Sequence, residues 1–154
     1  MSNVTITGKL NTDRTVVKEI FVNADGAVLT SGGAAYPQGA TAVTAASGNV
    51  ANAVAAATLA AVAGKTTYIT GFEITGSGAT LGSIVTATVT GTITGTLSYT
   101  VAAIAGALLI NTPLIVEFPV AIPASAANTT IVVSMPALGA GNTNATVVAH
   151  GYQV

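Results

Sequence analysis

The chain has 154 residues, of which 51% are apolar and only 6% are charged, with a formal net charge of −1 and no cysteine. An ordinary globular domain has about 25% charged residues, so the charge content is the abnormal quantity. The length fits one domain with a sizeable core. The composition lacks the basic excess of nucleic-acid-binding proteins, and without cysteine there is no disulfide or thiolate metal site. No window approaches the roughly 18 consecutive apolar residues of a membrane-spanning helix.

An almost uncharged surface favours association, because surface charge is what keeps soluble monomers dispersed. We therefore expect a homo-oligomer, and we expect neither nucleic acid nor a membrane among its partners. The first residues, Met1–Thr7, lack the charged-then-apolar pattern of a signal peptide, so classical secretion is not expected.

The charges that exist are concentrated at the start of the chain. Six of the nine charged residues (four Lys and Arg plus five Asp and Glu) lie within the first 25 positions: Lys9, Asp13, Arg14, Lys18, Glu19 and Asp25. They belong either to a solvated edge hairpin or to an arm that docks on a polar partner surface. In the second case Lys9, Arg14, Lys18 and Glu19 are the candidate contact residues.

The same region predicts a short arm rather than a domain. Val4–Thr7 predicts a strand, and Thr15–Val22 with Ala27–Thr30 predicts a hairpin around Asn23–Gly26, because Asp and Gly suit a turn. The Gly- and Ala-rich stretch Ser31–Asn49 is interpreted as a flexible linker. Residues 1–49 are therefore assigned to an N-terminal arm and residues 50–154 to a β-sandwich domain.

Short strands then recur at the spacing of a sandwich or barrel. Alanine favours a helix over Ala51–Ala63, but the segment has no 3.6-residue apolar stripe, so a strand is predicted within it. Pro119 and Pro123 are interpreted as punctuating a long connection. The predicted strands are Ala55–Val62, Thr67–Thr75, a ribbon over Val85–Val101, Leu114–Phe118, Ile131–Met135 and Ala145–His150. We count about eight strands from Ala55 onward and predict an all-β, antiparallel, jelly-roll-like sandwich.

The ribbon Val85–Val101 has the clearest pattern in the chain. Apolar residues and glycines occupy the odd positions, and Thr or Ser occupies every even position from Thr86 to Thr100. Such alternation predicts one buried and one exposed face. Seventeen residues are too long for one straight strand of a small domain, and a two-residue hairpin would exchange odd for even positions. The preserved parity predicts a loop of odd length, Gly91–Ile93 or Gly91–Gly95, or one bent strand.

No residue pattern predicts catalysis. His150 is the only histidine, and Glu73 and Glu117 are the only carboxylates after the arm. Acid–base and nucleophilic catalysis need a base beside its partner, and a transition-metal site needs three or four converging ligands. We therefore predict no enzyme, no cofactor and no catalytic or metal-binding residue, and we expect His150 at the surface or in an interface at the end of the last strand.

Several later segments resemble small virion proteins encoded by tailed bacteriophages. These segments are Ala63–Thr75, Pro113–Pro119, Ile122–Thr129 and Gly139–Tyr152. The resemblance covers about residues 55–152 and implies a capsid decoration (cement) protein, a β-sandwich that binds the outside of an icosahedral head. It implies the major capsid protein as partner, a homotrimer, synthesis in the host cytoplasm and a final place on the virion surface. The alternative is a tail-fibre or receptor-binding β module.

Overall fold

The computed structural model describes residues 5–9, 15–19, 36–37, 39–79, 81–106, 113–138 and 144–154. The chain divides into two compact units, Met1–Gln38 and Gly39–Val154. In the first unit, β1 (Thr5–Lys9) pairs antiparallel with β2 (Thr15–Glu19). The strand predicted at Val4–Thr7 corresponds to β1, which is the described partner of β2. The predicted turn Asn23–Gly26 and strand Ala27–Thr30 lie outside the described residues.

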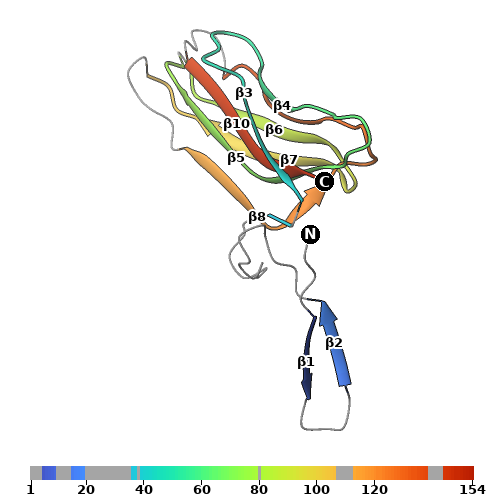
Figure 1. The fold of residues 1–154 in the computed structure, drawn as a ribbon. Helices are drawn as coiled ribbons and strands as arrows, with labels where there is room; N and C mark the ends of the chain where they lie inside the picture. Colours follow the sequence, from blue (N-terminus) through green and yellow to red (C-terminus); the bar gives the residue numbers. More distant parts are fainter. Residues whose placement is uncertain are drawn as a thin grey trace. The chain divides into compact units, whose positions relative to one another are not determined.

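The second unit contains two antiparallel four-stranded sheets, with strand orders β3-β10-β5-β8 and β4-β9-β6-β7 (Figure 1). Its strands are β3 (Thr41–Ala46), β4 (Ala55–Leu59), β5 (Thr67–Ser77), β6 (Ser83–Thr92), β7 (Gly95–Ala103), β8 (Leu114–Pro123), β9 (Ile131–Met135) and β10 (Asn144–Gln153). The predicted all-β, antiparallel sandwich is confirmed. No helix occurs among the residues that the structure describes, and thus none there that could span a membrane.

The prediction that Ser31–Asn49 is a linker is wrong over Thr41–Ala46. These residues form β3, which pairs along β10 from Val148 to Gln153. The structure describes seven strands from Ala55 onward, and β3 is the eighth of the sandwich. Its side chains are small and its inward residues, Val43 and Ala45, are only half-buried. The apolar alternation was therefore too weak to distinguish the strand from a Gly- and Ala-rich linker.

The strands pair as a folded double ribbon. The neighbours are β6 with β7, β5 with β8, β4 with β9, and β3 with β10. The β6–β7 turn is the midpoint of this pattern. The strands before the turn, taken backward from β6 to β3, pair one by one with the strands after it, taken forward from β7 to β10. Successive pairs alternate between the two sheets. This nesting brings residues from the beginning and the end of the sandwich into one sheet.

The β6–β7 hairpin preserves parity in a way that differs from the prediction. The turn is only two residues, Ile93 and Thr94, but the register shifts between Val89 and Thr92, so Val89 still lies opposite Leu97. The extra residue is a β-bulge containing Gly91, whose φ is +82°. Beyond the bulge the faces exchange: Thr92 is buried, and Ile93 is exposed. A bulge plus a two-residue turn therefore has the same effect on parity as an odd loop.

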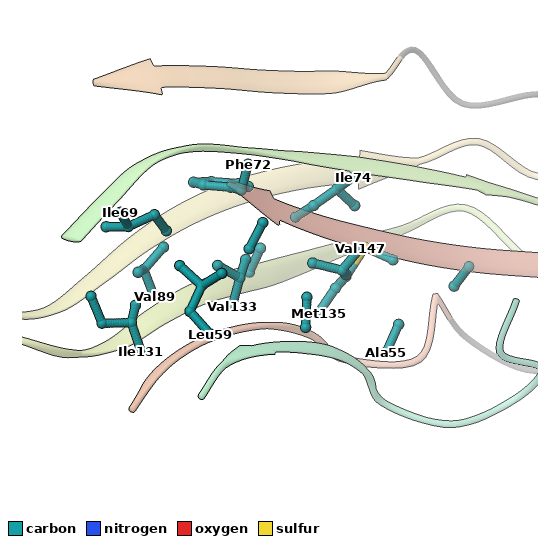
Figure 2. Close-up of a cluster of buried hydrophobic side chains, with 14 of the residues drawn as sticks. Ala55, Leu59, Ile69, Phe72, Ile74, Val89, Ile131, Val133, Met135 and Val147 are labelled. Carbon is teal, nitrogen blue, oxygen red and sulfur yellow. The ribbon is translucent and has the colours of Figure 1, made fainter. Parts of the chain in front are cut away.

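The core lies between the sheets and is lined by inward-facing residues of both sheets (Figure 2). Ile131, Val133 and Met135 of β9 are fully buried, as predicted. The larger fully buried side chains also include Leu59, Ile69, Phe72, Val89, Leu138 and Val147.

The prediction that Pro119 and Pro123 belong to a connection is wrong. Both lie in β8, which extends from Leu114 to Pro123. This strand has a single neighbour, β5, so it is an edge of its sheet. Proline lacks a backbone N–H and is tolerated on an edge strand.

Candidate functional site

The titratable residues that looked isolated in the sequence gather on the outer face of one sheet. Glu73 lies on β5, Glu117 on β8 and His150 on β10, which are three adjacent strands. The register sets Gly71 of β5 opposite His150 on one side and opposite Glu117 on the other. Sequence reasoning missed this group because the three strands are neighbours only through the nested pairing, for which the sequence has no local signal.

A shallow depression of about 280 Å³ lies at this position, with Gly71 among its lining residues. Its walls include Glu73, Ile115, Glu117 and His150. Gly71 contributes no side chain, and a Cβ there would come within 2.6 Å of the Val116 carbonyl oxygen. The register between β5 and β8 also breaks here, since Ile69 lies opposite Ile122 but Gly71 lies opposite Glu117. The depression thus follows from a required glycine and an irregular edge strand.

The electrostatic interaction between His150 and Glu73 in this depression is weak. His150 Nε2 lies 3.6 Å from Glu73 Oε1, too long for a hydrogen bond, and the two side chains are 39% and 50% exposed. An ion pair between them requires a protonated imidazole and is screened by solvent. Although the ring is partly exposed, its Nε2 atom is covered and has no hydrogen-bond partner among the described residues.

The arrangement limits the chemistry that this face can perform. Over the part of the chain that the structure describes, no three His, Asp or Glu side chains are grouped so as to hold a metal ion. His150 does not end its strand as predicted, because β10 continues past a bulge at Gly151 to Gln153. It is half-exposed on the outer face.

Of the predicted partner-contact residues, the structure assigns three to one antiparallel strand pair. Lys9 of β1 lies opposite Thr15, Lys18 of β2 opposite Ile6, and Glu19 opposite Thr5. Arg14 lies outside the described residues. Their contact with a partner stays a prediction.

The outer face of the second sheet carries no charge and consists mainly of hydroxyl and small side chains, with Ile84 and Val132 among them. Thr86, Ser98 and Thr100 are exposed, whereas Thr88 and Thr90 are half-buried beside β9. Thr88 Oγ1 and Ser134 Oγ are 3.0 Å apart and share a hydrogen bond across the β6–β9 pair. The alternation of the ribbon therefore predicted the outward direction of these side chains correctly up to the bulge, but not the partial burial of Thr88 and Thr90 beside β9.

No family model, curated protein or solved structure matches this chain.

Proposed function

We propose that this chain is a structural virion protein of a tailed bacteriophage that binds the outer surface of the capsid and stabilises it. Its partners are the major capsid protein and other copies of itself, as a trimer. It performs no catalysis and needs no cofactor. The single observation that carries the proposal is the division of charge between the two units of the chain.

That division separates two physical roles. Six of the nine charged residues lie within the first 25 positions, inside the unit Met1–Gln38, and the sandwich unit has only Lys65, Glu73 and Glu117. A nearly neutral sandwich suits close packing against copies of itself, because little repulsion opposes contact. A charged hairpin unit suits recognition of a polar shell, where charges set the specificity and rate of docking.

The segments that resemble phage virion proteins also form a coherent part of the fold. They include most of β5, β8 and β10, which are adjacent strands of one sheet although they are far apart in the chain. The nested strand pairing further supports the jelly-roll assignment as the finer description of the sandwich. Because these strands are neighbours in one sheet, the resemblance applies to one continuous part of the fold, and this supports the proposal.

Such a protein would stabilise the head by linkage. If it binds the intact, expanded shell and not the ruptured one, each bound copy shifts the equilibrium toward the intact shell, and stabilisation grows with occupancy. The hairpin unit would bind by strand pairing or by charged contacts from Lys9, Arg14, Lys18 and Glu19.

Quantitative mass spectrometry of purified virions tests this proposal. Decoration predicts hundreds of copies of the chain in each particle, in fixed ratio to the major capsid protein. A count of a few tens or fewer would contradict decoration and favour the alternative of a tail-fibre or receptor-binding module. Absence from the virion would overturn both.

A further inference from the structure

Among the described residues, the two edge strands on one flank of the sandwich lie close together, and those on the other flank do not. Strands β3 and β4 are the edges of their sheets on one flank, and several of their residues lie within 8 Å of each other, measured between Cα atoms. On the opposite flank the edges are β7 and β8, and over their described residues no comparable approach joins them. We name this side the open flank. It is formed by the inward-facing residues of the two edges: Leu97, Tyr99, Val101, Leu114, Val116 and Phe118.

The open flank is apolar but incompletely covered. All six of its side chains are half-buried, although the alternation directs them toward the core. Phe72 of β5 lies between the two edges, 5.1 Å from the Tyr99 ring and 6.3 Å from the Phe118 ring, measured between centroids. Phe72 is fully buried, whereas its two neighbours are not. An aromatic cluster thus extends from the core toward the surface.

The edge strand β7 also lacks the features that protect edges from pairing. Natural edges are shortened, interrupted by proline or a bulge, or marked by charge. The edges β3 and β4 have six and five residues, and β8 contains Pro119, Glu117 and an irregular register. By contrast, β7 has nine residues, Gly95–Ala103, with no proline and no charge. Of the edge strands that the structure describes in the sandwich, β7 alone is both long and without these protecting features.

We infer that the open flank is a subunit interface, and that its occupant is a second copy of this chain. Two observations point to it independently: the half-buried apolar row and the unprotected backbone edge of β7. The partner must be apolar and uncharged where it touches this row, and the same flank of another copy has that character. Glu117 is the only charged residue on either edge strand, and it alternates with the inward row.

Copies that turn this flank toward a common axis would cover one another's apolar rows and remove the β7 edge from water. The arrangement agrees with the trimer proposed above but does not depend on capsid binding. It can therefore be tested on the isolated protein, and its failure would leave the capsid proposal to its own experiment.

The test is sedimentation equilibrium of the full chain at micromolar concentration, with a matched pair of variants. Thr100 of β7 and Thr86 of β6 lie directly opposite each other, are both exposed and share the outer face. Lysine on an edge strand opposes strand pairing, and its charge is costly to bury. We expect Thr100→Lys to weaken self-association about tenfold or more, because it places a charge at the interface. Thr86→Lys, one strand further from the edge, should associate like the wild type.

A wild-type chain that sediments as a 14.9 kDa monomer would overturn the inference. So would equal association by both variants and wild type, or equal weakening by both variants. Circular dichroism of each variant verifies folding. If Thr100→Lys does not fold, Ser98→Lys, which is exposed on the same edge opposite Thr88, replaces it with the same expected loss.

Discussion

The buried centre of the sandwich and its open flank are built from the same residue pattern but differ in how far it is covered. Val89 of β6 and Leu97 of β7 lie opposite each other in one hairpin and point the same way. Val89 is fully buried, yet Leu97 is only half-buried. The difference follows from position, since β6 has a neighbour on each side and β7 has one. Alternation thus determines the direction of a side chain, whereas strand order determines the depth of its burial.

The largest expected effect comes from a charge in the centre. Val89→Asp would bury an unpaired carboxylate at a position with no exposure, and we expect it to lower the free energy of unfolding by about 3–5 kcal/mol. The neighbouring Thr88→Asp should cost only about 1 kcal/mol, because position 88 is half-buried on the outer face and the Ser134 hydroxyl can still donate to the new carboxylate. Urea denaturation measures both. Equal damage would mean that the Thr face is buried as deeply as the core.

Two phenylalanines on adjacent strands compare the centre and the flank with the same chemical change. Phe72→Ala should cost about 3–5 kcal/mol, because the fully buried ring leaves a cavity. Phe118→Ala, on the half-buried edge strand, should cost roughly half as much, because solvent already reaches part of the ring. Denaturation at low protein concentration avoids any contribution from association. A Phe118→Ala cost as large as that of Phe72→Ala would show that the flank is already closed within one chain.

Two glycines near the β6–β7 turn have the same φ angle but differ in how closely other atoms approach them. Gly91 and Gly95 both have φ of +82°, where an L residue is strained. Gly95→Ala should cost about 1–2 kcal/mol from strain alone, because a Cβ there meets nothing within 4 Å. Gly91→Ala should cost more, because its Cβ would collide with the Thr130 carbonyl oxygen beside β9. Thermal denaturation of the two variants compares them directly, and similar melting temperatures would contradict the proposed contact.

The smallest expected effect is a pH dependence of stability that involves the flank. Burial raises the pKa of Tyr99 above its ordinary value of 10.0. The folded protein then keeps the phenolic proton at pH values where the unfolded chain has lost it, so stability falls as the pH rises above 10. Tyr99→Phe should reduce this alkaline loss, as measured by urea midpoints at neutral pH and above pH 10. If Tyr99→Phe loses as much stability above pH 10 as the wild type, another group is responsible. One candidate is Tyr152, because burial also raises its pKa.

Most of the fold could be predicted from local pattern. In an alternating strand such as Ile131–Met135, the three apolar residues Ile131, Val133 and Met135 identify the face that points to the core. Two kinds of feature could not be predicted in this way. Strand β3 reads Thr-Ala-Val-Thr-Ala-Ala and has little apolar contrast between its two faces, so only its pairing with β10 identifies it. The group Glu73, Glu117 and His150 requires the order β10-β5-β8, which arises from pairing between distant segments. The parity of the Thr ribbon was informative, but a bulge and an odd loop satisfy it equally.

The central claim, that the chain decorates a capsid through its N-terminal unit, is tested most directly by binding to undecorated heads. The full chain is compared with a variant that lacks residues 1–30, a deletion that ends before the sandwich unit begins at Gly39. We expect the shortened chain to fold and associate but to bind heads poorly, and those heads to rupture at a lower temperature than heads bearing the full chain. Unchanged affinity of the shortened chain for the heads would contradict the role of the N-terminal unit, and failure of the full chain to bind would contradict decoration itself.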